Sequence, residues 1–369
     1  MPRPTMMEQL TSLSEDALER LAQSPFTRTA VEELERPELR VLPLVVGGDP
    51  HGRGVVATAN YVARAFGIHS AMSCAEARRR CAHATFVRPR HTVYRDYSRE
   101  VWSTVREIVP TVEQTGIDEG YLDLREVAPS FDDARAVAEA VQAVVRTRTG
   151  LSCSLGVAGS KVVAKIASDR RKPGGLTAVR PGREAAFLAP FPIRVLPGVG
   201  PRAEERLVAA GVTTIGALAA LDDDELATIS RGKVGRELRD RARGIDPRPL
   251  EVSTERISIS QEETFAQDVG EVERLHHELR RMAHGLSGHL TRRGQVARTV
   301  TTKLRYPDFS IRTRSTSLAV GTDDAARIGA LACDLLDRAL RERPGPLRLV
   351  GVGVSGLADH VQLSLPAGV

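Results

Sequence analysis

The sequence lacks the features of membrane and secreted proteins. Its 369 residues contain no run of eighteen apolar side chains and no charged segment followed by an apolar leader. A helix needs about 20 apolar residues to cross a bilayer, so we expect neither membrane insertion nor secretion. The cysteines, Cys74, Cys81, Cys153 and Cys333, are too scattered for a disulfide framework and favour a reducing cytoplasm. Zinc would need a fourth ligand beside Cys74, Cys81 and His83, so packed or surface thiols are the better interpretation.

Lysine is also rare, since only five of the 52 basic residues are lysines. This bias is typical of a GC-rich genome. Three of the five, Lys161, Lys165 and Lys172, nevertheless fall in one segment, SKVVAKIASDRRKPGG. A compact ammonium group differs from the planar fork of arginine, so these positions indicate a specific need for lysine. Chance clustering is the alternative.

The length and hydrophobic periodicity predict a chain of about two to four domains that mixes helices and strands. Residues up to about 180 read as an α/β or α+β domain, residues 181–248 as nearly all helix, and residues 259–358 as a β-α-β-β-α-β domain. The predicted helices cover residues 9–22, 59–66, 74–81, 94–109, 132–149 and 160–171, and the predicted strands cover residues 40–49, 112–117, 121–124 and 151–158.

Two adjacent carboxylates stand out in TGIDEGYLDL, residues 115–124. On one continuous strand, neighbouring side chains point to opposite faces, and the pair could not share a ligand. Gly120 follows the pair and can supply the left-handed backbone of a tight hairpin, so we expect Asp118 and Glu119 at a hairpin tip. Two carboxylates that point the same way suit Mg²⁺. An ordinary polar turn is the alternative.

Basic residues and a glycine-rich turn both indicate DNA binding. The segment from Arg280 to Arg314 contains nine basic residues and a single acid. The alternating strands around Lys303 and Arg305 would gather these charges on one face of a sheet, which suits a phosphate backbone. A solvated basic face is the alternative. In LPGVGPRAEERLVAAGVTTIGALAAL, two helices flank the turn at Gly198 to Gly200 and resemble a helix-hairpin-helix, whose backbone amides bind a phosphate. A plain helical hairpin is the alternative.

The order of motifs resembles that of Y-family DNA polymerases, in the DNA polymerase IV (DinB) branch. The similar segments cover residues 28 to 365: AVEELERPELRVLPLVVGG, GVVATANYVARAFGIHSAMSCAEARRRC, GIDEGYLDL, SLGVAGSKVVAKIASDRRKPGGL, ISQEETF and GVGVSGLADHVQLSLP. The resemblance implies an α+β right-hand polymerase with this division: palm at residues 1–27 and 90–180, fingers at 28–89, helical thumb at 181–248, linker at 249–258, little finger at 259–358 and a tail at 359–369.

The resemblance also implies the function, template-directed translesion DNA synthesis by two-metal phosphoryl transfer. The implied metal ligands are Asp118 and Glu119 with Mg²⁺, or Mn²⁺ as a substitute. The implied contacts to the triphosphate of the incoming deoxynucleotide are Thr58, Tyr61, Arg64 and Lys172. The implied partners of this cytoplasmic monomer are primer-template DNA and a sliding clamp, whose binding pentapeptide resembles QLSLP with Gln362, Leu363 and Leu365.

The sequence departs from the family at the first metal motif. Such polymerases begin with an apolar strand bearing two aspartates and two aromatic residues. An ungapped alignment places Gln23 and Pro25 at the aspartates, and Thr27 and Arg28 at the aromatic residues, of which the second is the steric gate against ribonucleotides. The segment LSEDALERLAQSPF reads as a helix in place of that strand.

Three explanations of this departure stay open. The N-terminus could derive from a frameshift or a misassigned start. Another carboxylate, such as Asp16, Glu19 or Asp123, could replace the lost ligand. Lastly, the chain could be a non-catalytic DNA-binding scaffold for repair or replication proteins. Loss of a catalytic residue lowers rates by orders of magnitude, and the sequence therefore leaves activity as a question for experiment.

Overall fold

The computed structural model describes residues 20–24, 27–230, 232–252 and 256–359. The chain divides near residue 253 into two compact units, and the short segments 49–54 and 73–75 are grouped with the second unit. Among the described residues, no helix is both long and apolar enough to span a membrane.

A five-stranded sheet lies at the centre of the first unit. Its strand order is β5-β6-β1-β7-β8, and all neighbours are antiparallel except β7 and β8. Its elements are β1 (Arg20–Ser24), β5 (Val112–Gln114), β6 (Gly120–Asp123), β7 (Ser154–Ala158), β8 (Leu176–Ala178), α4 (His91–Ile108), α5 (Phe131–Thr149) and α6 (Lys161–Asp169).

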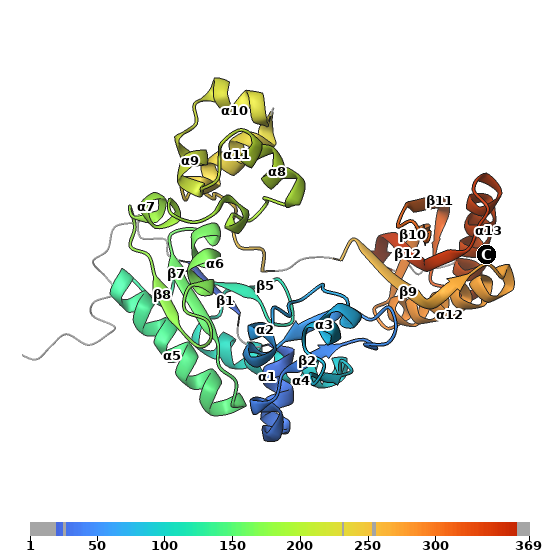
Figure 1. Cartoon of the computed structure of the whole chain (residues 1–369), viewed down its shortest axis with the longest axis horizontal. Helices are drawn as coiled ribbons and strands as arrows, with labels where there is room; N and C mark the ends of the chain where they lie inside the picture. The colour runs from blue at the N-terminus through green and yellow to red at the C-terminus, as the bar shows by residue number, and fades with distance from the viewer. Residues whose placement is uncertain (1–19, 25–26, 231, 253–255, 360–369) are drawn as a thin grey trace, which may run out of the picture. The chain divides into compact units, whose positions relative to one another are not determined.

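The two faces of this sheet bury different helices (Figure 1). Leu155 and Val157 on β7 pack into the core formed with α4 and α5. The alternate residue Gly156 faces α6, and a Cβ there would lie 2.5 Å from the backbone nitrogen of Ser168. Because strand side chains alternate between faces, β7 separates the two layers. Helix α6 is therefore seated directly on the strand backbone.

A smaller sheet in the first unit has the order β3-β2-β4. Its central strand β2 is buried along its whole length. The strand predicted over residues 40–49 is confirmed at 44–47 only, because its first two residues belong to the 3-10 helix η2. The elements of this region are α1 (Arg28–Glu35), η2 (Pro37–Val41), β2 (Leu44–Gly47), β3 (Val56–Ala59), α2 (Tyr61–Ala65), α3 (Cys74–Arg80) and β4 (Thr85–Val87).

The rest of the first unit is helical, as expected for residues 181–248. A hydrophobic core joins these helices to α6, with Val163 and Leu188 among its fully buried members. The elements are α7 (Glu184–Leu188), η3 (Ile193–Val195), α8 (Pro201–Ala209), α9 (Ile215–Ala220), α10 (Asp223–Ile229) and α11 (Lys233–Ala242).

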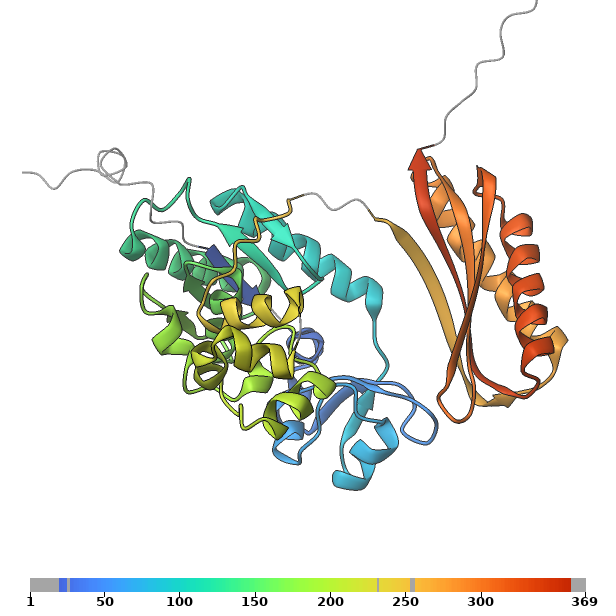
Figure 2. The same ribbon diagram turned by 90° about the horizontal axis from the view of Figure 1, so that it is seen from above.

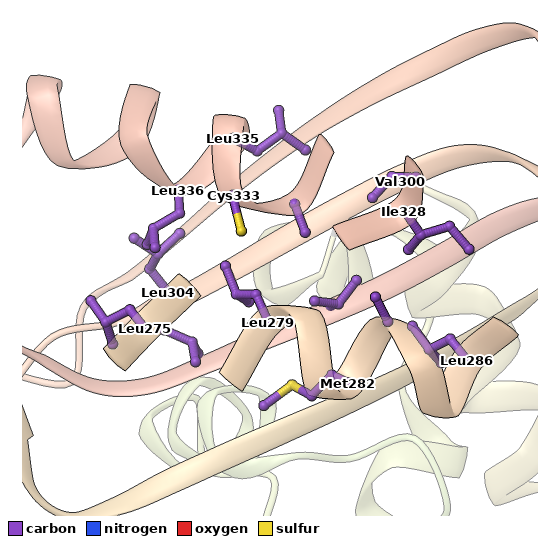
Figure 3. Close-up of a cluster of buried hydrophobic side chains, with 14 of the residues drawn as sticks. Leu275, Leu279, Met282, Leu286, Val300, Leu304, Ile328, Cys333, Leu335 and Leu336 are labelled. Atoms are coloured by element: carbon purple, nitrogen blue, oxygen red, sulfur yellow. The ribbon is translucent and has the colours of Figure 1, made fainter. Parts of the chain in front are cut away.

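The second unit confirms the β-α-β-β-α-β prediction. Its antiparallel sheet has the order β11-β10-β12-β9, and two helices cover one face of it (Figure 2). Leucine and other aliphatic side chains of both helices fill the core against the sheet (Figure 3). The elements are β9 (Ser258–Val269), α12 (Val272–Thr291), β10 (Gln295–Arg305), β11 (Ile311–Thr322), α13 (Ala325–Glu342) and β12 (Leu347–Asp359).

The predicted helix over residues 9–22 is wrong at its end. Residues 20–24 form β1, which pairs with β6 on one side and with β7 on the other. The helical reading rested on local patterns alone, whereas two free strand edges supply hydrogen bonds along the whole segment, and tertiary pairing overrides local propensity. Residues 9–19 lie outside the described residues.

Candidate active site

The acidic pair lies at a hairpin tip, where Asp118 and Glu119 connect β5 to β6. The carbonyl of Glu119 accepts hydrogen bonds from the amides of Thr115 and Gly116, both at 3.0 Å. Trp102 Nε1 on α4 donates a hydrogen bond to the carbonyl of Ile117, just before the acidic pair, at 3.2 Å. The turn is therefore held by its own backbone and by a buried helix.

The predicted role of Gly120 is wrong. This residue does not adopt a positive φ, so the turn does not use the left-handed freedom of glycine. Instead, a Cβ at Gly120 would lie 2.6 Å from the carbonyl oxygen of Glu113 and 2.6 Å from the ring of Trp102. Glycine is needed here because the strand packs against a tryptophan, which a pattern of turn residues could not reveal.

The two carboxylates have different electrostatic surroundings. Lys165 Nζ on α6 lies 2.6 Å from Glu119 Oε1. The pKa of Asp118 is raised, chiefly by burial and then by the charge of Glu119, while Arg28 and Lys165 act in the opposite direction. A carboxylate that burial makes costly to ionise is a group that a bound cation would stabilise.

The oxygen donors fit a hard divalent cation but form an incomplete set. Among the described residues, no group of three His, Cys, Asp or Glu side chains could hold a metal ion. Asp123 does not complete the set, because its carboxylate accepts from Arg125 Nε at 2.8 Å and from the Arg125 amide at 3.1 Å. Asp16 and Glu19 lie outside the described residues.

Strand β1 supplies the backbone position of the missing aspartate. Gln23, the residue aligned with the first aspartate of the motif, pairs with Gly120 on β6 and with Leu155 on β7. Gly120 directly follows Glu119, so position 23 is on the strand beside the acidic turn. Residues 20–24 therefore form a strand where the resemblance expects one, with Gln23 at the position of the expected aspartate.

Three of the four residues predicted to bind triphosphate line one cleft of about 280 Å³: Tyr61, Arg64 and Lys172. The guanidinium of Arg64 lies 5.9 Å from the ring centroid of Tyr61 and donates to the carbonyl of Ala59 at 2.9 Å. Lys172 Nζ lies 2.6 Å from Asp169. Thr58 is buried in β3, and the residues after it, Ala59 and Asn60, line the cleft in its place.

Two functional candidates were missed by the sequence analysis, Glu33 and Asn60. Both line the same cleft. Asn60 is the N-cap of α2 and accepts from the Ala63 amide at 2.9 Å, a role that an asparagine just before a helix could have indicated. Its amide also donates to Glu33 on α1 at 2.8 Å. No sequence pattern indicates that second contact, because 27 residues separate the partners.

The predicted helix-hairpin-helix has an unequal pair of helices. Gly198 has φ +103, and Gly200 caps α8 in open space, where a Cβ would have nothing within 4 Å. The helix before the turn is only the three-residue 3-10 helix η3. Gly200 therefore begins α8 in open space, whereas a Cβ at Gly198 would lie 2.8 Å from Arg241 Nη1 on α11.

The expectation that the basic residues share one face is wrong. In the antiparallel register, Lys303 and Arg305 lie on the open face of the sheet. Arg312 and Arg314 pair with Leu304 and Thr302, so they lie on the face that carries the helices. A shift of one residue between the two strands reverses the face of every side chain, and sequence alone does not fix that register.

The ion pairs of these residues follow the same division. Lys303 donates to Glu262 at 2.8 Å across Gly351, and Arg314 pairs with Glu342 on α13. The tail residues Gln362, Leu363 and Leu365 lie outside the described residues.

The chain is similar to proteins of one known family. The impB/mucB/samB family matches residues 28–169, and the C-terminal domain of the same family matches residues 256–365. DNA polymerase IV of Streptomyces coelicolor is 42% identical over 339 residues, which are 91% of this chain and 70% of that protein. DNA polymerase IV of Halorhodospira halophila is 42% identical over 328 residues, 89% of this chain and 92% of that protein.

Solved structures show the same fold. A chimaera of the Y-family DNA polymerases Dbh and Dpo4 superposes with a TM-score of 0.85 at 24% identity, covering 92% of this chain and 99% of the chimaera. An insertion ternary complex of Dbh DNA polymerase gives a TM-score of 0.66 at 24% identity, covering 92% and 99%. The chain therefore belongs to the impB/mucB/samB family, as a DinB-type Y-family DNA polymerase.

Proposed function

We propose that the chain extends a DNA primer by template-directed addition of deoxynucleotides, as a DNA polymerase of the translesion type. One observation carries this proposal: the start of α1 lies close to both the cleft and the acidic pair. Thr27 and Thr29 line the cleft, and Arg28 between them is near enough for its charge to oppose the rise in the pKa of Asp118. A triphosphate in the cleft would thus have its reacting end near the acidic pair.

Asp118 and Glu119 would hold the divalent metal ions that polymerases of this family use. Carboxylate oxygens suit Mg²⁺, and Mn²⁺ is the natural substitute because it accepts the same ligands. Bound there, such an ion would stabilise charge on the transferring phosphoryl group and favour ionisation of the primer 3′-hydroxyl. Lys165 would have to release Glu119, or share it, when the metal ion binds.

The cleft residues would bind and orient the triphosphate. Lys172 and Arg64 bring positive charge to the cleft, and Tyr61 offers a hydroxyl on a side chain that is 56% exposed. Cations beside the phosphates lower the cost of charge that develops as the leaving pyrophosphate separates. Thr58 supports this site only from the buried strand behind it.

DNA would be held by sites outside the cleft. We assign palm, fingers, thumb and little finger to the residue ranges predicted from the sequence, with the amides at Gly198 and Gly200 on the DNA backbone. Lys303 and Arg305 would contact phosphates from the open face of the second unit, and Gln362, Leu363 and Leu365 would bind a sliding clamp. Such a substrate implies a cytoplasmic protein, and a monomer is sufficient for this arrangement.

The non-catalytic scaffold is not favoured. Relatives named DNA polymerase IV match nearly the whole chain, and a scaffold has no need of the cationic cleft at Arg64 and Lys172.

Primer extension by the purified chain tests the proposal. We expect extension with Mg²⁺ or Mn²⁺ that is lost in the double variant Asp118→Ala, Glu119→Ala and retained in Asp132→Ala, whose carboxylate forms an exposed ion pair elsewhere. Binding of deoxynucleotide to the chain on primer-template should weaken in Lys172→Ala. Extension that survives in the double variant, or primer-template binding without any nucleotide binding, would contradict the proposal.

A further inference from the structure

Lys161 is a buried cation that the proposed chemistry does not use. It is the first residue of α6, one helical turn before Lys165, and only 5% of it is exposed. A buried ammonium group is costly unless charged and polar partners surround it. Its partners therefore indicate why one of only five lysines stands at this position.

The partners of Lys161 come from two distant parts of the chain. Its ammonium group pairs with the carboxylate of Glu113 on β5 and donates to the carbonyl of Pro249 at 2.7 Å. It also lies 5.3 Å from the ring centroid of Tyr121 on β6. Lys161 thus connects the strands of the acidic hairpin to the segment that follows the last helix of the first unit.

Glu113 makes a second contact to the same segment. Its carboxylate accepts from the backbone amide of Glu251 at 3.0 Å. At the other end of this segment, the carbonyl of Gly244 accepts a hydrogen bond from Ser160 Oγ, just before α6, at 2.8 Å. The segment between Gly244 and Glu251 is therefore fastened at both ends to the start of α6 and to β5.

The same elements carry the acidic pair. Glu113 and Tyr121 lie on the two strands whose connecting turn contains Asp118 and Glu119. Lys165 lies four residues after Lys161, on the same side of α6, and binds Glu119. One face of α6 thus contacts both the segment 244–251 and the turn that contains Asp118 and Glu119.

We propose that Lys161 and Glu113 are positioning residues, which couple the attachment of the segment 244–251 to the placement of the acidic hairpin. Release of the segment would remove the carbonyl of Pro249 from Lys161 and the amide of Glu251 from Glu113. Strand β5 would then shift so that water could reach these buried charges. This shift would move Asp118 and Glu119 out of position for metal binding. Small displacements of reacting groups cost large factors in rate, so we expect slower catalysis. The kinetic part of this inference rests on the proposed polymerase activity.

The test compares Lys161→Met with the charge-conserving Lys161→Arg and with Glu113→Gln in the full chain. Arg135→Met is the matched control, because it breaks an exposed ion pair with Glu139 within the same unit. Two quantities are measured: hydrogen exchange at the Glu251 amide, and the affinity of the chain for Mn²⁺ by electron paramagnetic resonance. Primer extension then gives kcat and the KM for deoxynucleotide.

In Lys161→Met and Glu113→Gln we expect faster exchange at Glu251, weaker Mn²⁺ binding and a kcat lower by about tenfold, with the KM nearly unchanged. Lys161→Arg should recover part of each loss, and the double variant should cost no more than either single one, since the pair acts as a unit. Folding of each variant is checked by circular dichroism, and if Lys161→Met does not fold, Lys161→Arg and Glu113→Gln carry the comparison.

The outcomes are separable. Faster exchange with unchanged Mn²⁺ affinity and unchanged kcat would overturn the coupling, because the pair would then only fasten the segment. Unchanged exchange in folded variants would overturn the fastening itself. If the unmodified chain extends no primer, the proposed function fails, whereas exchange and Mn²⁺ binding still decide whether the segment and the acidic hairpin are coupled.

Discussion

The side-chain amide of Asn60 donates a hydrogen bond to Glu33 Oε1 at 2.8 Å, and this contact joins α1 to the start of α2. Asn60 Oδ1 also accepts a hydrogen bond from the Leu44 amide at 3.0 Å, so Asn60 connects β2 to both helices. Tyr61 and Arg64, one and four residues further on, face the cleft. Glu33 therefore orients the helix that carries two of the proposed triphosphate contacts.

Replacement of Glu33 by alanine should raise the KM for deoxynucleotide by about tenfold, with a smaller change in kcat, because one charged hydrogen bond contributes about 1.5–3 kcal/mol. Steady-state primer extension at varied nucleotide concentration measures both constants. Glu38→Ala, on the exposed helix η2, is the control. A fall in kcat with an unchanged KM would contradict the assigned role.

A buried ion cluster in the same unit predicts a pH dependence of stability. Glu32 is fully buried, and although burial alone would raise its pKa, hydrogen bonds from Arg90, Tyr94 and Arg36 hold the pKa below its usual value of 4.5. A depressed carboxylate pKa contributes stability above the unfolded pKa, and this contribution is lost as the pH falls below about 4.5.

Glu32→Gln should lower the free energy of unfolding by about 3 kcal/mol at neutral pH, since it leaves two arginines without their shared carboxylate. The difference between the two proteins should shrink as the pH falls from 5 to 3, which urea unfolding at several pH values measures. A difference that stays constant over that range would show that the charge of Glu32 is not what stabilises the fold.

The register of β1 predicts that a carboxylate can be restored. Gln23 pairs with Gly120 and Leu155, so Gln23→Asp places an acid on the strand next to Asp118 and Glu119. We expect tighter Mn²⁺ binding and faster primer extension, by at least tenfold, because a third carboxylate completes the ligand set for a divalent ion. The same substitution one position earlier, Ala22→Asp, is the control, since adjacent strand residues face opposite sides. Equal gains from both would show that only added negative charge matters.

The tight contact at Gly120 predicts a strong effect of one methyl group. Gly120→Ala should destabilise the first unit by about 1–3 kcal/mol, because the backbone carbonyl of Glu113 and the ring of Trp102 would have to move. Gly200→Ala is the matched control, with open space around its Cβ and φ −87. Thermal unfolding compares the two, and similar melting temperatures would refute the steric interpretation.

The ion pair of Lys303 with Glu262 predicts a gain in DNA affinity. Glu262→Gln removes a negative charge from the open sheet face and releases Lys303 to contact a phosphate, so binding to primer-template should tighten. Arg305→Ala should weaken DNA binding and reduce the slope of log affinity against log salt concentration by about one. Titrations at several salt concentrations test both, and a salt slope that neither substitution changes would place the DNA elsewhere.

Long periodic elements could be predicted from the sequence, whereas residues brought together by tertiary contacts could not. The apolar run at residues 40–49 predicted a buried strand, which the structure has at Leu44–Gly47, and the alternation around Lys303 predicted β10. The strand at residues 20–24 was missed, because only its partners β6 and β7 select an extended conformation there. Local propensity carries no information about a free strand edge elsewhere in the chain.

The candidate site divides in the same way. Asp118 and Glu119 could be found because they are adjacent in sequence, and a resemblance was needed to group Arg64 with Lys172. Glu33 escaped, since its contact with Asn60 spans 27 residues. Lys161 stood out as one of the clustered lysines, but its role could not be predicted, because its carboxylate partner Glu113 lies 48 residues away. Register likewise decided which arginines of β10 and β11 share a face, and hydrophobic alternation fixes a strand's faces without fixing its partner.

The close contact between α6 and β7 leaves no room for a side chain between helix and sheet. Without a side chain at Gly156, the helix backbone lies directly on the strand, where a Cβ would clash with the backbone of Ala164 and Ser168. Lys161 and Lys165 therefore share a common frame, about one helical turn apart. Any side chain at Gly156 should accordingly displace α6 from the strand, so that one substitution would disturb both the contacts of Lys161 and the ion pair of Lys165 with Glu119.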